Sequence, residues 1–162
     1  MAHAARRYFD AKRPSVRLAR QFVTTTLTSW GITGEPIEDI RLCASELTSN
    51  ALTHGTRRGH GFLVSLSAFD DLVRLEVHDS RDATAERLPQ VRQATGTQGS
   101  GRGLRIVGSL AQDWGVDRRE PFGKVVWSHF KTVSEDLQTG VIPRAENGVP
   151  PGPTFHGCQE IA

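Results

Sequence analysis

Apolar residues recur at helical spacing in three segments of the chain. Residues 15–30 place them at three- and four-residue steps behind a proline-serine start signal. Residues 37–51 repeat the spacing more regularly, and Gly55 closes that run. Residues 104–111 form a third, shorter run. The pattern therefore predicts three amphipathic helices.

Other segments alternate apolar and polar residues with a period of two, which is typical of half-buried strands. Residues 62–68 and 72–79 alternate in this way and predict one hairpin. By the same parity, Asp79 points toward the apolar side. Residues 114–118 and 124–130 predict a final hairpin.

The order of these elements indicates the fold class. The strands arrive in hairpins, and no regular strand-helix-strand alternation is present. We therefore expect an α+β fold: a two-layer sandwich whose sheet is mixed, mostly antiparallel, with helices on one face. Residues 13–131 are predicted to form this domain, residues 1–12 an N-terminal extension, and residues 132–162, rich in Pro, Gly and polar residues, a disordered tail.

Composition limits the classes of function. The 162 residues are 37% hydrophobic and 23% charged, a globular composition for one domain. The net charge of +2 comes without a basic run, so we expect no direct nucleic-acid binding. Apolar stretches are too short to span a bilayer, and the N-terminus lacks an apolar signal region, so we expect a cytoplasmic protein without membrane contact. Two cysteines without close spacing predict no zinc site.

Three features could carry chemistry. Glu46 and Asn50 lie four residues apart on the second helix, with His54 one turn further, although an isolated pair of this kind is more often a solvated flank. Asp79, if buried, needs donors such as the amine of a nucleotide base, or else caps a turn. Four glycines within residues 96–103 precede the third helix and could hold phosphate, or act as a plain hinge.

The order of these features resembles a known superfamily. Residues 46–55 (ELTSNALTHG) resemble the N box of the GHKL, or histidine-kinase-type, ATPases, which have the Bergerat fold. Residues 77–79 (VHD) resemble their G1 box, and residues 101–107 (GRGLRIV) their G2 box. Within the superfamily, the chain is most similar to the bacterial anti-sigma-factor serine/threonine kinases of the regulator-of-sigma-B type.

The resemblance implies a role for individual residues. Glu46 would be the catalytic base, Asn50 the Mg²⁺ ligand, and Asp79 the acceptor for the adenine amino group. The remaining residues implied in ATP binding lie at the end of the N box and in the glycine-rich loop with the helix that follows: His54, Gly99, Gly101, Arg102, Gly103 and Leu104.

The same resemblance implies partners. The protein would use ATP and Mg²⁺ to phosphorylate a serine or threonine of an anti-anti-sigma antagonist, would sequester a sigma factor, and would form a homodimer. The alternative is a non-catalytic regulator of the same fold that acts by binding alone. Glu46 favours the kinase, whereas the sequence Asp79-Ser80-Arg81-Asp82, without the superfamily's G1 glycines, favours the alternative. A third reading, an ATP hydrolase, is disfavoured because no transducer domain is present.

Overall fold

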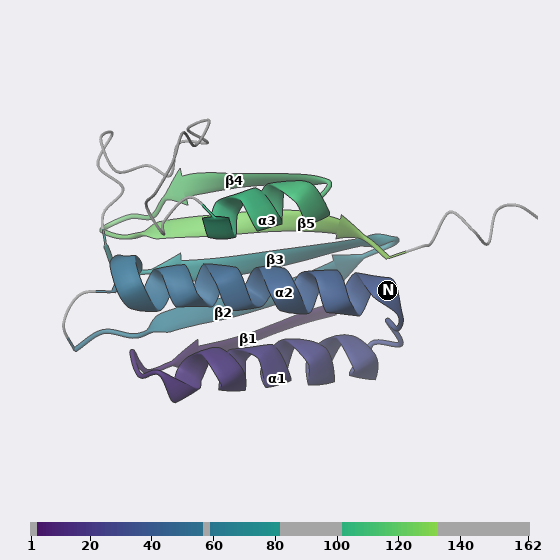
Figure 1. Ribbon diagram of the computed structural model, residues 1–162, viewed down its shortest axis with the longest axis horizontal. Helices are drawn as coiled ribbons and strands as arrows, with labels where there is room; N and C mark the ends of the chain where they lie inside the picture. Colours follow the sequence, from purple (N-terminus) through teal and green to yellow (C-terminus); the bar gives the residue numbers. More distant parts are fainter. Residues whose placement is uncertain (1–2, 57–58, 82–101, 133–162) are drawn as a thin grey trace, which may run out of the picture.

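The computed structural model describes residues 3–56, 59–81 and 102–132, which form a sheet covered by helices on one face (Figure 1). The strands are β1 (His3–Phe9), β2 (Phe62–Phe69), β3 (Leu72–Asp79), β4 (Asp113–Arg118) and β5 (Lys124–Lys131). The helices are α1 (Pro14–Ser29), α2 (Glu35–Asn50), the π-helical turn η1 (Ala51–Gly55) and α3 (Arg102–Leu110).

The sheet has the order β1-β2-β3-β5-β4, and each pairing between described strands is antiparallel. Seen from the helix side, α1 lies over the β1 end of the sheet, α2 over its centre and α3 over the β4–β5 end (Figure 1). The predicted α+β sandwich with helices on one face is confirmed. Both predicted hairpins and all three predicted helices are present, with ends that differ by a few residues.

The core lies between the sheet and the helices. Alternate residues of β2 and β3 face it, as the period of two predicted, and all of them are buried: Phe62, Val64, Leu66, Ala68, Val73, Leu75 and Val77. The helices contribute the apolar stripes that the spacing predicted, with Ala19, Val23 and Leu27 from α1 and Ile37, Ile40, Ala44 and Leu47 from α2. Burial of these two matching surfaces fixes which side of each helix faces the sheet.

Strand β1 was not predicted. Sequence analysis placed residues 1–12 in an extension, yet His3–Phe9 pairs with β2 along its whole length, from His3 opposite Ala68 to Phe9 opposite Phe62. Most of its side chains are exposed, so no apolar alternation marks the segment. Its backbone hydrogen bonds and the buried ring of Phe9 hold it at the sheet edge.

The three tryptophans are divided between the core and the opposite face of the sheet. Trp30 and Trp114 pack against the core. Trp127 lies on the opposite face of the sheet, where the Arg74 guanidinium sits 4.8 Å from its ring centre. Gly115 on β4 makes room for this ring, since a side chain there would overlap it.

Two expectations fall largely outside the described residues. The predicted tail is described only at Thr132, whose backbone N–H donates to the Asp71 carbonyl at 2.8 Å. Most of the loop between β3 and α3 is likewise not described. Within the described part of the chain, no helix has the length and apolar character needed to cross a bilayer.

We predict that Phe9 anchors β1. Its ring stacks on Phe62 with centroids 5.6 Å apart and is only 4% exposed. Phe9→Ala should lower the free energy of unfolding by about 3–5 kcal/mol, as measured by denaturant titration. The matched control is Phe69→Ala on β2, whose side chain is 66% exposed and whose removal should cost less than about 0.5 kcal/mol. Equal losses in the two variants would contradict an anchoring role for Phe9.

Candidate functional site

The predicted site residues gather at one end of the two-layer structure. Glu46 and Asn50 lie in the last turns of α2, and α2 packs against both α3 and the turn η1. The turn η1 in turn contacts β3, which ends at Asp79. The end of α2 therefore lies between the start of α3 and the end of β3.

The first turn of α3 lies directly against the two polar side chains of α2. A Cβ atom placed on Gly103 would lie 2.8 Å from Glu46 Oε2 and 3.2 Å from Asn50 Nδ2. Both side chains are half-buried, whereas a plain solvated flank would be exposed. Gly103 leaves room for this close approach, so the N-terminus of α3 lies beside the carboxylate and the amide.

Asp79 is buried on the helix side of the sheet, as its parity predicted. Its side chain is 3% exposed, and Oδ2 lies 2.6 Å from the Lys124 ammonium. Oδ1 accepts a hydrogen bond from the Arg81 backbone N–H at 3.2 Å. Burial raises the pKa of Asp79, and the Lys124 ammonium, the Arg81 amide and the charge of Arg119 partly offset that increase.

Two glycines leave room for Asp79 at the end of β3. Any side chain at Gly55 would overlap the carboxylate, and any side chain at Gly123 would overlap the Asp79 carbonyl. Gly123 also has a positive φ of 98°, a conformation that glycine adopts without strain. The backbone of the π-helical turn at Gly55 thus packs directly against the side chain of Asp79 at the end of β3.

Further hydrogen bonds tie η1 to the residues after β3. The Arg81 backbone N–H donates to the Gly55 carbonyl at 2.8 Å, and the Arg81 guanidinium donates to the His54 carbonyl at 3.0 Å. The His54 side chain is exposed. Single-turn π-helices of this kind are often found at functional sites.

The structure brings some predicted residues together and leaves others apart. Glu46, Asn50 and Gly103 converge, while Asp79 lies beyond η1 next to Gly55. The side chain of Leu104 belongs to the buried core, so only its backbone can serve a ligand, and Arg102 is exposed at the start of α3. Gly99 and Gly101 lie outside the described residues.

Sequence reasoning missed Lys124 and the contacts of Gly55 and Gly123. Lys124 is directly opposite Asp79 in the register of β3 and β5. A signal for this pairing existed, because residues of opposite charge that lie directly opposite each other on neighbouring antiparallel strands form cross-strand ion pairs. It could be used only once β5 was known to neighbour β3.

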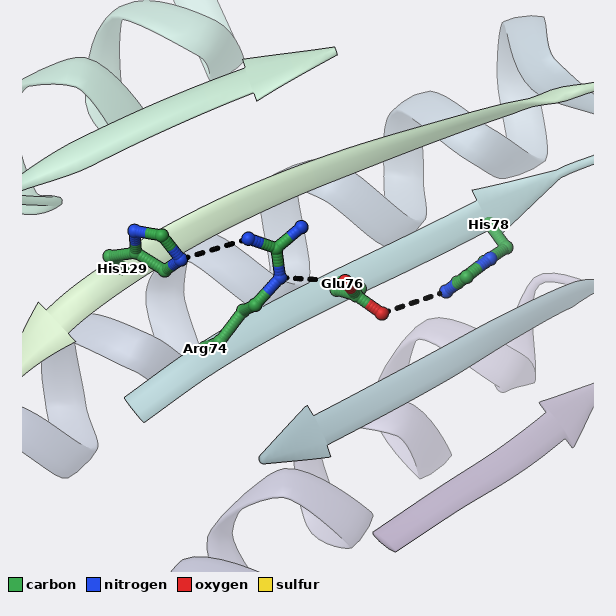
Figure 2. Close-up of polar contacts among 4 residues, drawn as sticks. All are labelled: Arg74, Glu76, His78 and His129. Atoms are coloured by element: carbon green, nitrogen blue, oxygen red, sulfur yellow. Dashed lines mark hydrogen bonds and ion pairs between the residues drawn. The ribbon is translucent and has the colours of Figure 1, made fainter. Parts of the chain in front are cut away.

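A second polar cluster was also missed, on the face of the sheet away from the helices (Figure 2). Arg74 donates to His129 Nε2 at 3.0 Å and to Glu76 at 2.7 Å, and His78 lies 3.1 Å from Glu76. Burial alone would raise the pKa of Glu76, but the hydrogen bonds from Arg74 and His78 outweigh it and lower that pKa. These alternate positions of β3 and β5 lie on the opposite side from Asp79, so the cluster is separate from the site on α2.

The donor set limits which cofactors the site could hold. Among the described residues, no group of three or more His, Cys, Asp or Glu side chains could by itself hold a metal. Magnesium commonly takes one or two protein oxygens together with phosphates and water. The Asn50 amide and the Glu46 carboxylate beside a helix N-terminus fit that mode of binding. Burial raises the pKa of the Cys43 thiol to about 12, which excludes it as a thiolate nucleophile.

Comparison with known families decides where this arrangement belongs. The family described as "Histidine kinase-like ATPase domain" matches residues 9–130, which include every element that builds the site. The chain belongs to this family. Its fold is the Bergerat fold of the GHKL superfamily, as the sequence boxes indicated.

Individual relatives add little to the family assignment. No curated protein matches this histidine kinase-like ATPase chain. Among solved structures, it is similar to the crystal structure of full-length ShkA in complex with AMPPNP, with 21% identity and a TM-score of 0.48. The match covers 74% of this chain and 30% of ShkA, so the chain spans less than a third of that protein's length.

We predict that Gly55 and Asp79 are energetically coupled in this histidine kinase-like domain. Gly55→Ala should destabilise the fold by about 1–3 kcal/mol, because the new methyl group overlaps the buried carboxylate. In an Asp79→Ala background the same change should cost clearly less, giving a coupling energy of about 0.5–3 kcal/mol in denaturant unfolding. Additive effects of the two changes would show that Gly55 is needed for another reason.

Proposed function

We propose that this domain binds ATP with Mg²⁺ and transfers its γ-phosphoryl group to a serine or threonine of a partner protein. The observation that carries the proposal is the convergence of Glu46 and Asn50 on Gly103 at the N-terminus of α3, in a chain of the histidine kinase-like ATPase family. A carboxylate, an amide and a helix N-terminus at one point suit phosphate and its metal ion.

Each residue has a distinct task in this proposal. Asn50 holds Mg²⁺, which, when bound with ATP, neutralises charge on the phosphates. Asp79 accepts a hydrogen bond from the adenine amine, and its burial makes that contact selective. Backbone N–H groups of Gly103 and Leu104 face the phosphates, as would those of Gly99, Gly101 and Arg102. The exposed His54 lies at the edge of the proposed site.

Glu46 acts on the hydroxyl of the partner. Its carboxylate accepts the hydroxyl proton as the oxygen bonds to the γ-phosphorus, and the bond from that phosphorus to the β–γ bridging oxygen breaks. The leaving ADP carries away the electron pair of the broken bond. Mere nucleotide binding needs no carboxylate at this position, so Glu46 favours a kinase.

The partners follow from the resemblance described above. The substrate would be an anti-anti-sigma antagonist, and the domain would also sequester a sigma factor in the cytoplasm, as a homodimer. Phosphorylation of the antagonist adds about two negative charges and would decide which partner is bound. The catalytic unit would be residues 13–131 together with β1, which completes the sheet.

A non-catalytic regulator is the second candidate. The residue after Ser80 is Arg81, where the superfamily's G1 box has glycines. The Arg81 guanidinium donates a hydrogen bond to the His54 carbonyl. This contact favours a site that holds nucleotide, or a partner, without turnover. Transfer of phosphate distinguishes the two candidates.

We predict separable effects of Asn50 and Glu46. ATP at one hundred times its Kd should stabilise the wild type by about 2.7 kcal/mol when Mg²⁺ is present. Asn50→Ala should remove this Mg²⁺-dependent gain in melting temperature. Glu46→Gln should keep it but lower phosphoryl transfer at least about 100-fold. Glu35→Gln, an exposed change at the other end of α2, is the matched control and should alter neither.

Transfer can be measured with γ-labelled ATP and an ATP-depleted lysate of the source cells, followed by phosphoamino-acid analysis. Label on serine or threonine that depends on Glu46 supports the kinase. ATP binding without such label supports the regulator that acts by binding alone. No response of the wild type to millimolar ATP contradicts the kinase and favours a regulator that acts through contact with its partner alone.

A further inference from the structure

The ion pair between Asp79 and Lys124 is the most buried one between described residues. The two side chains are 3% and 13% exposed, whereas the other ion pairs of the described chain involve more exposed partners. Lys124 stands at the first position of β5, opposite Asp79 in the register, and both point toward the helix layer. Burying two charges is costly, and such pairs add little to stability overall. Their position at the proposed base site therefore suggests a role in binding.

The pair leaves hydrogen-bonding capacity unused. An ammonium has three donors, and the only acceptor that Lys124 meets among the described residues is Asp79 Oδ2. The carboxylate also retains lone pairs, since Oδ1 accepts from the Arg81 N–H and Oδ2 from Lys124. The pair thus presents a donor and an acceptor side by side, 2.6 Å apart.

An adenine ring carries the complementary pattern on one edge. Its exocyclic amine donates, and the adjacent ring nitrogen N1 accepts. We propose that Lys124 is a second base-recognition residue, which donates to adenine N1 while Asp79 accepts from the amine. This inference rests on the ATP binding proposed above and adds the residue that reads the base together with Asp79.

The charges around Asp79 are consistent with this role. Burial would favour a protonated carboxyl, and a protonated oxygen is a weaker acceptor for the amine. Lys124 on β5, the Arg81 amide after β3 and Arg119 before β5 all lower the pKa of Asp79. Lys124 therefore serves both halves of the pattern, as a donor itself and as a cation that opposes protonation of the neighbouring carboxylate.

The test compares ATP with 1-deaza-ATP, which keeps the amine but replaces N1 with a C–H group. In calorimetric titrations with Mg²⁺, the full-length wild type should bind ATP about tenfold or more tightly than 1-deaza-ATP. Lys124→Met should bring this ratio close to 1. Lys131→Met, an exposed change at the other end of β5, is the matched control and should keep the wild-type ratio.

The ratio of the two affinities does not depend on the stability of the variant, because both nucleotides are titrated into the same folded protein. Should Lys124→Met fail to fold, Lys124→Gln keeps a neutral partner for Asp79 but shortens the side chain, and the ratio should fall in the same way. Lys124→Arg, which keeps charge and donors, should retain most of the discrimination.

Other outcomes overturn the inference. A wild type that binds both nucleotides equally does not read N1. An unchanged ratio in Lys124→Met assigns N1 to another group, and tighter ATP binding by that variant means that Lys124 blocks the acceptor. Failure of the wild type to bind either nucleotide overturns the proposed function itself, which distinguishes that failure from failure of the role of Lys124.

Discussion

The burial of a single carboxylate, that of Asp79, constrains the whole end of the molecule where the site lies. A buried charge needs partners, and here the partners come from three separate parts of the chain. Lys124 supplies a cation from the neighbouring strand, and the Arg81 amide supplies a hydrogen bond. Gly55 and Gly123 supply space, because neither could carry a side chain without overlapping Asp79. The end of β3, the start of β5 and the turn after α2 are held together at this point.

The one-sided arrangement of layers separates two chemically different surfaces. The helices cover the apolar face of the sheet, so side chains on the helix side are buried unless they lie at an end of the layer. Glu46 and Asn50 lie at such an end, where α3 approaches them through Gly103. The opposite face carries polar and aromatic side chains, with Arg74 at their centre between Trp127 and Glu76. The proposed nucleotide site and this polar cluster therefore lie on opposite sides of the sheet.

Much of this architecture could be predicted from the sequence, and the exceptions have physical causes. The helices and hairpins follow from the spacing of apolar residues, and parity alone placed Asp79 inside. Strand β1 was not predicted because an exposed edge strand is held by backbone hydrogen bonds, which leave no apolar pattern in the sequence. The face on which Trp127 lies could not be predicted, because residue type does not say which face of a strand is covered. Lys124 could not be assigned to Asp79, because their contact depends on strand order and the chain positions are 45 apart.

The central claim is that a nucleotide binds between Gly103 and Asp79, on the helix side of the sheet. Amide chemical shifts of isotopically labelled protein during titration with Mg²⁺ and ATP test it most directly. The account predicts the largest changes at Gly55, Arg81 and Gly103, with the Trp127 indole on the opposite face unchanged. Changes centred on Trp127, or none at the three amides under saturating ATP, would contradict it.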